Sequence, residues 1–178
     1  MASRKPKTVL FRRKRESRTD YGKRLKILLA HKARVVVRFT NQKIIAQLVQ
    51  FEPQGDRVVL GIESSKLKKL GWDYSLKNLP AAYLTGLMFG KEALAKDQKE
   101  GVFDTGFKTP LHKGKVYAFL KGVVDSGFTI PHGEEDIFPS EERLSGKHLE
   151  EYAAQGENKE KYAKLAASFK QIKEKLSS

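Results

Sequence analysis

The sequence predicts an α/β protein with a mixed five-stranded sheet and helices on its faces. Runs of β-branched residues come first, between residues 34 and 62, and short polar turns join them. Segments with helical periodicity then alternate with short apolar strands up to residue 131. The resulting order, β-β-β-α-β-α-β, is a meander followed by right-handed crossovers.

We divide the 178-residue chain into three parts on this basis. Residues 1–33 form a basic extension with a short helix, and residues 34–131 form the α/β core domain. Residues 132–178 form a C-terminal extension that carries an amphipathic helix.

The meander is predicted from two turn signals. Arg34–Phe39 and Lys43–Val49 are β-branched runs on either side of Thr40-Asn41-Gln42, so they predict an antiparallel hairpin. A second turn, Pro53-Gln-Gly-Asp56, precedes a third strand from Arg57 to Ile62.

Helices follow the meander. Asn78 is a candidate N-cap with Pro80 in the first turn, and the helix should continue through Lys96. Gly86 and Gly90 form a GxxxG pattern within it. In a membrane this pattern is typical of a dimer face, but in this helix we expect it to allow close packing on the sheet.

Shorter elements complete the core. We expect a strand at Gly101–Phe103, a helix at Lys115–Asp125 that ends at Gly127, and a last strand at Phe128–Ile130 that Pro131 stops. Residues 134–142 hold five acids and no bases, which is typical of a solvated loop. A final helix is predicted over residues 158–176, and its narrow apolar stripe should dock on this domain or on a neighbouring molecule.

Positive charge is concentrated at the front of the chain. Residues 1–43 hold 15 Lys or Arg and two acids, whereas the other 135 residues hold 20 bases and 19 acids. Residues 1–18 have few apolar groups to bury, so we expect them to be extended or disordered until a partner is present. Asp20 can cap a short helix that runs to about Lys32. This distribution predicts a polyanion as partner, with nucleic acid the first candidate and an anionic membrane the second.

Several functional classes lack their signatures. The chain has no cysteine, so disulfides and thiolate metal sites are excluded. Its four histidines have no metal-ligand spacing, and no phosphate-binding or nucleophile motif occurs. The longest apolar run, Ala81–Phe89, is too short to span a membrane. We therefore predict no catalytic residue, metal or cofactor, and a cytoplasmic protein.

The predicted topology raises one enzymatic alternative, because ribonuclease-H-like nucleases share this strand order. Such enzymes need several carboxylates that converge on metal ions. The first predicted strand, Arg34–Phe39, has no acid and has a base at its start and near its end. We therefore expect the fold without the catalysis.

The sequence resembles a known family at several collinear stretches. These are Phe11-Arg-Arg-Lys-Arg-Glu16, Thr19-Asp20-Tyr21, Arg38-Phe-Thr-Asn41, Ile44-Ile-Ala-Gln47, Asn78-Leu-Pro-Ala-Ala-Tyr-Leu-Thr-Gly86, Phe119-Leu-Lys-Gly122, Ile130-Pro-His132 and Arg143-Leu-Ser-Gly146-Lys-His148. They are similar to the 5S-rRNA-binding proteins of the large ribosomal subunit, the family numbered eighteen, in its archaeal and eukaryotic long form. Ser17-Arg18 stands where the family commonly has Gly-Lys, and the segment from Phe103 to His112 is compact.

The resemblance implies a structural RNA-binding protein that attaches 5S rRNA to the large-subunit rRNA in the central protuberance. The implied partners are these two RNAs and neighbouring ribosomal proteins, including the other 5S-binding protein, and no membrane. The residues expected to contact RNA are Arg4, Lys5, Lys7, Phe11, Arg12, Arg13, Lys14, Arg15, Arg18, Tyr21, Lys23, Arg24, Arg38, Thr40, Asn41, Lys113 and Lys115. The alternatives are the metal-dependent nuclease and a general polyanion or membrane-surface binder.

Overall fold

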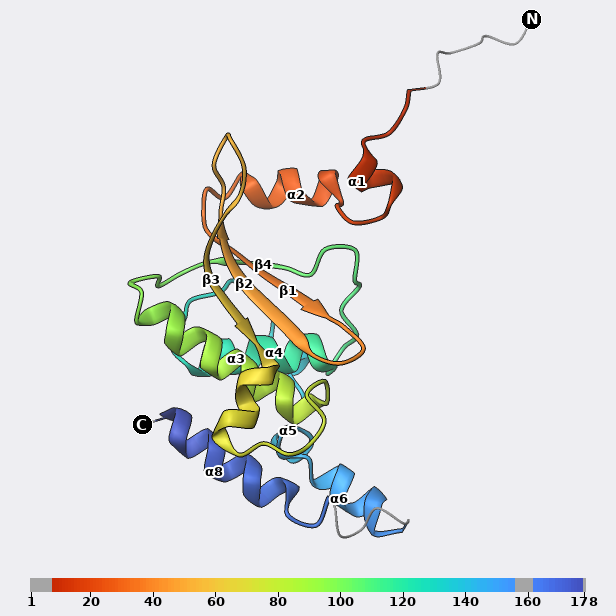
Figure 1. Ribbon diagram of the computed structural model, residues 1–178, viewed down its shortest axis with the longest axis vertical. Coiled ribbons are helices and arrows are strands. Elements are labelled where there is room, and N and C mark those ends of the chain that lie inside the picture. Colours follow the sequence, from red (N-terminus) through yellow and green to blue (C-terminus); the bar gives the residue numbers. More distant parts are fainter. Residues whose placement is uncertain (1–7, 156–161, 178) are drawn as a thin grey trace, which may run out of the picture.

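The computed structural model describes residues 8–155 and 162–177. One mixed sheet carries helices on one face, and the N-terminal segment lies at the other side of the sheet (Figure 1). The elements in chain order are α1 (Arg12–Arg15), α2 (Tyr21–Leu28), β1 (Arg34–Phe39), β2 (Ile44–Gln50), β3 (Arg57–Glu63), the 3-10 helix η1 (Ser64–Leu70), α3 (Leu79–Leu94), β4 (Val102–Asp104), α4 (Lys115–Asp125), the 3-10 helix η2 (Glu135–Ile137), α5 (Glu141–Ser145), α6 (Lys147–Ala154) and α8 (Leu165–Ser177).

The sheet has the order β3-β2-β1-β4. Antiparallel pairing of β1 with β2 and of β2 with β3 confirms the predicted meander. β4 pairs with β1 in parallel. Consequently the C-terminal ends of β1, β3 and β4 lie along the same border of the sheet, its carboxyl edge.

The sheet has four strands, not the predicted five. Thr129, in the middle of the expected last strand, makes only a single parallel bridge with Glu100. Its amide donates to the Lys99 carbonyl, and its own carbonyl accepts from Gly101. Pro131 follows two residues later and has no amide hydrogen, so the pairing cannot continue as a ladder.

The GxxxG prediction named the wrong surface. A Cβ atom at Gly86 would lie 2.1 Å from the Phe119 carbonyl oxygen, and one at Gly122 would lie 2.2 Å from the Tyr83 carbonyl oxygen. The small residues therefore bring α3 into close contact with α4, one helix against the other, and not with the sheet. The predicted bounds of α4 and the Asn78 cap of α3 are confirmed.

The C-terminal helix docks on its own chain. Leu165, Phe169 and Ile172 of α8 are buried in the main hydrophobic core, next to α3. The beginning of the helix predicted at residue 158 lies outside the described residues, and α8 starts at Leu165. The sequence did not predict η1, η2, α5 or α6. η2 and the beginning of α5 lie within residues 134–142, which were expected to form a loop.

The N-terminal segment is more ordered than expected. Arg12–Arg15 form one helical turn, whereas residues 1–18 were expected to be extended or disordered without a partner; residues 1–7 lie outside the described residues. Asp20 caps α2 as predicted, accepting a hydrogen bond from the Lys23 amide at 3.0 Å. The helix ends at Leu28 and not at Lys32. Its apolar residues are not buried in the core, and Leu25 is 64% exposed.

Among the described residues, none of the helices has both the length and the apolar character needed to cross a bilayer.

Candidate nucleic-acid interface

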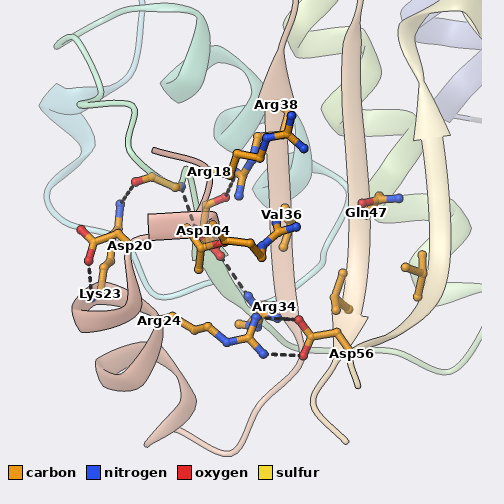
Figure 2. Close-up of a pocket in the computed structure, with 15 residues that line it drawn as sticks. Arg18, Asp20, Lys23, Arg24, Arg34, Val36, Arg38, Gln47, Asp56 and Asp104 are labelled. Carbon is orange, nitrogen blue, oxygen red and sulfur yellow. Dashed lines mark hydrogen bonds and ion pairs between the residues drawn. The ribbon is translucent and has the colours of Figure 1, made fainter. Parts of the chain in front are cut away.

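The two faces of the sheet carry different side chains. Along β1, Val35 and Val37 are buried beneath the helices. Arg34, Val36 and Arg38 alternate with them and lie on the other face. That face and the N-terminal segment enclose an open pocket of about 280 Å³ (Figure 2).

A chain of charged residues ties α2 to the sheet. The Arg24 guanidinium donates two hydrogen bonds to the Asp56 carboxylate, at 2.7 and 2.8 Å. Arg34, buried at the start of β1, donates to Asp56 and also to Asp104, the latter at 3.1 Å. Figure 2 shows the contacts of both arginines converging on Asp56. Bidentate pairing of this kind fixes orientation as well as position.

This network shifts the pKa values of Asp56 and Arg24. Partial burial alone would raise the pKa of Asp56, but the hydrogen bond from Arg24 and the charge of Arg34 outweigh it and hold that pKa below its usual value. The same hydrogen bond raises the pKa of Arg24. Both groups are therefore charged at neutral pH.

A second set of contacts reaches the loop after β4. The Lys23 ammonium donates to the Thr105 hydroxyl at 3.0 Å and to the Gly106 carbonyl at 3.1 Å. Lys23 and Arg24 were both predicted to contact RNA. In this structure their charged groups are bonded within the protein, so they hold α2 in place.

Arg38 keeps an uncompensated charge. Its guanidinium donates to the carbonyl oxygens of Val37 and Asp104, at 2.8 and 3.1 Å, and it pairs with no carboxylate in the part of the chain that the structure describes. Gly106 lies against it with φ of +64°, and a Cβ there would come within 3.0 Å of the guanidinium. Both this backbone conformation and this close contact favour glycine.

The cations around α1 differ in their partners. Glu16 lies 3.0 Å from Arg18 and 3.9 Å from Arg12, and Arg13 donates to the Thr19 hydroxyl at 2.9 Å. The side chains of Lys14 and Arg15 make no hydrogen bond or ion pair with the described residues. These five cations share one carboxylate, so the segment around α1 remains strongly positive.

Aromatic rings lie beside these cations, as the sequence predicted. The ring centroids of Phe11 and Tyr21 are 5.6 Å apart. Phe11 is 73% exposed. An exposed ring next to cationic groups can stack on an unpaired base while the cations contact phosphate.

The tip of the β1–β2 hairpin is held by its own hydrogen bonds. The Thr40 hydroxyl accepts from the Lys43 amide at 3.0 Å and donates to the Lys43 carbonyl at 2.7 Å. Thr40 therefore shapes the turn, and Asn41 is exposed at its tip.

The remaining predicted residues lie elsewhere. Lys113 pairs with Asp136 at 2.8 Å, and Lys115 begins α4. Arg4, Lys5 and Lys7 lie outside the described residues.

Sequence reasoning missed the three residues that complete the network. Arg34 lies in a predicted strand and Asp56 in a predicted turn, but neither they nor Asp104 were predicted as site residues. The sequence does place a base, Arg34, in a predicted strand, and residues two positions apart in a strand lie on the same face of the sheet. The sequence does not say which acid that base would meet. No cluster of three or more metal-ligating side chains occurs within residues 8–155 and 162–177.

Comparison with known proteins decides the family. Residues 5–104 match the family described as ribosomal large subunit proteins 60S L5 and 50S L18. The chain belongs to this family. Large ribosomal subunit protein uL18 of Methanospirillum hungatei is 46% identical over 82% of this chain and 82% of its own length. The corresponding protein of Methanothrix thermoacetophila is 46% identical over 81% and 85%, and that of Methanococcoides burtonii is 44% identical over 94% and 92%.

The family assignment confirms the predicted resemblance. It places the chain among rRNA-associated proteins of the large ribosomal subunit, which are structural and not enzymes. The matched residues include α1, α2 and all four strands, so they contain the whole charged network described above.

Proposed function

We propose that this chain binds 5S rRNA and holds it against the large-subunit rRNA in the central protuberance, beside the other 5S-binding protein. The observation that carries the proposal is the position of the cationic segment. The network of Arg24, Asp56, Arg34 and Asp104, together with Lys23, holds α2 against the sheet. Cations that are positioned before binding lose less entropy when they meet phosphate.

Nine of the predicted contact residues touch the RNA in this proposal. Arg12, Arg13, Lys14, Arg15 and Arg18 contact phosphates. Arg38 contacts the backbone from the open face of the sheet, and Asn41 reaches the RNA from the hairpin tip. Phe11 and Tyr21 stack on unpaired bases, which adds specificity to a contact otherwise governed by shape and charge.

The order of the strands bears on the choice between RNA binding and nuclease activity. The order β3-β2-β1-β4, with a residual bridge at Thr129, is what a ribonuclease-H-like sheet would leave if its last strand were reduced. The first strand of such a nuclease would supply a catalytic carboxylate. Here that strand presents Arg34 and Arg38 to the open face.

The test is a binding competition. The protein is titrated with 5S rRNA in the presence of tRNA at moderate salt, both as the full chain and without residues 1–18. We expect a preference for 5S rRNA that weakens in the truncated protein. Equal affinity for the two RNAs would contradict the proposal, and strand cleavage after addition of magnesium would favour the nuclease instead.

A further inference from the structure

A second group of cations lies where α3 and α4 begin. Lys77 directly precedes Asn78, the N-cap of α3, and Lys115 is the first residue of α4. Lys108 lies in the loop that joins β4 to α4. All three side chains are exposed. Of the three, only Lys115 was predicted from the sequence to contact RNA.

The packing of α3 on α4 brings these lysines together. Tyr83 of α3 meets Gly122 of α4, and further along Gly90 meets Ser126. The contacts advance in the same direction along both helices, so the helices are parallel and their N-termini lie at the same end. Each N-terminus carries a partial positive charge from its free amide groups, and this charge adds to that of the lysines.

The same end of the molecule is the carboxyl edge of the sheet. β1, β3 and β4 all point toward it, and the chain leaves β4 to enter the loop that contains Lys108. Binding sites of open α/β sheets are found beyond this edge, because loops and helix N-termini meet there.

The charges in this group repel one another. Burial lowers the pKa of Lys115, and the charges of Lys77 and Lys108 lower it further. Within residues 8–155 and 162–177, no acidic side chain shifts the pKa of Lys115. Lys113, two residues before Lys115, is different because Asp136 neutralises it.

Exposed apolar groups accompany the lysines. The Lys108 ammonium lies 4.8 Å from the centroid of the Phe39 ring. Phe107 is 50% exposed and Leu111 is 77% exposed. Lysines beside an exposed ring are typical of surfaces on which bases stack while the backbone is neutralised.

The lysine group is continuous with the cations around α1. Arg13, Arg18, Arg38 and Lys108 line one open hollow together with Phe39 and Phe107. Positive charge therefore extends from α1, across the end of β1, to the beginnings of α3 and α4.

We infer that Lys77, Lys108 and Lys115 form a second phosphate-binding surface, which holds an RNA backbone at the carboxyl edge of the sheet. The inference deepens the proposed function, on which it rests. The cations around α1 bind one stretch of the RNA, and the lysine surface binds a further stretch along the same track. A protein with two such surfaces fixes the direction of the RNA as well as its position.

The test compares two variants that each lose two charges. Lys108→Gln with Lys115→Gln removes charge from the proposed surface. Lys91→Gln with Lys99→Gln removes the same charge near the other end of α3 and is the matched control. We expect the first pair to reduce the slope of log affinity against log salt by about 2 and the control pair to leave the slope nearly unchanged.

Backbone footprinting of 5S rRNA locates the contact. The first pair should lose protection at nucleotides that remain protected when residues 1–18 are removed. Lys77→Gln alone should lose part of the same protection. Thermal unfolding of each variant shows that the fold is intact.

The outcomes separate the two proposals. If both pairs change the slope equally, or neither changes it, the lysine surface does not bind RNA and the inference is overturned. If instead the wild-type chain has no preference for 5S rRNA over tRNA, the proposed function fails. The slopes measured on tRNA would still show whether the three lysines contact phosphate.

Discussion

The two faces of the sheet are held by different forces. On one face, Val35 and Val37 pack beneath α3 and α4, and the two helices approach to backbone contact at Gly86 and Gly122. On the other face, the Arg34 guanidinium donates hydrogen bonds to two carboxylates, and the N-terminal segment is held by hydrogen bonds between polar side chains. Apolar contact determines the first face, and charge pairing determines the second.

The helical face therefore contributes mainly to stability, and the charged face contributes mainly to binding. Close packing depends on atomic fit, so small changes of volume on the helical face should be costly. The charged face contributes less to stability, because hydration competes with each ion pair. Its value lies in holding cations at fixed positions. Substitutions on the two faces should therefore differ in their effects on the free energy of unfolding and on RNA binding.

The largest effect is expected at the contact between α3 and α4. A Cβ at Gly122 would lie 2.2 Å from the Tyr83 carbonyl oxygen and 2.8 Å from the Leu87 amide nitrogen. Both are backbone atoms, so the helices must separate to admit a methyl group. Gly122→Ala should lower the free energy of unfolding by about 3 kcal/mol, measured by urea denaturation.

Gly61→Ala is the matched control on the sheet. A Cβ at Gly61 would meet no atom within 4 Å, so its effect should stay within about 0.5 kcal/mol. Equal effects at the two glycines would show that close packing does not hold the helical layer.

The next effect is expected at the buried arginine. Arg34→Met leaves Asp104, whose side chain is only 9% exposed, without its ion-pair partner. An unpaired buried charge is costly, and we expect a loss of about 2 kcal/mol in the free energy of unfolding. The loss is less than for a fully buried pair because Asp56 keeps its bonds with Arg24.

A second substitution distinguishes charge from volume. Asp104→Asn removes the unpaired charge but leaves an oxygen to accept the Gly106 amide. In the Arg34→Met background it should recover part of the lost stability. No recovery would mean that the packing of Arg34, and not its charge, matters.

A smaller effect should appear in the pH dependence. Because the pKa of Asp56 is lower in the folded protein than in the unfolded chain, its contribution is present above about pH 4 and is lost as the pH falls through the folded value. Asp56→Asn should therefore cost about 1 kcal/mol at neutral pH. The stabilities of wild type and variant should converge as the pH falls below the folded pKa of Asp56, as measured by denaturation at each pH. A gap that stays constant with pH would assign the loss to shape instead of charge.

Local signals were sufficient for much of the fold. The β-branched runs, the turn at Thr40, the Asn78 cap and the stripe of α4 each depend on residues close in sequence, and the structure confirms them. The fifth strand failed because a three-residue run can be paired only if a neighbour offers a ladder. The GxxxG pattern predicted close approach, but the identity of the approaching surface depends on tertiary packing.

The candidate site divides in the same way. Charge counting located the cationic segment without any knowledge of the fold. It did not separate Lys14 and Arg15, whose side chains have no partner among the described residues, from Lys23 and Arg24, whose side chains bond within the protein. That separation depends on Asp56 and Thr105, which are distant in sequence and meet α2 only in the folded chain.

The smallest effect on stability is expected where the effect on binding is direct. Arg13→Ala with Arg15→Ala removes two cations of α1 that make no ion pair with the described residues, so the free energy of unfolding should change by less than about 0.5 kcal/mol. If both side chains contact phosphate, binding to 5S rRNA should weaken and the salt slope should shrink by about 2. Lys91→Ala with Lys99→Ala controls for net charge. An unchanged slope in the arginine variant would show that α1 does not contact the RNA, and the difference between the two faces would then be one of stability alone.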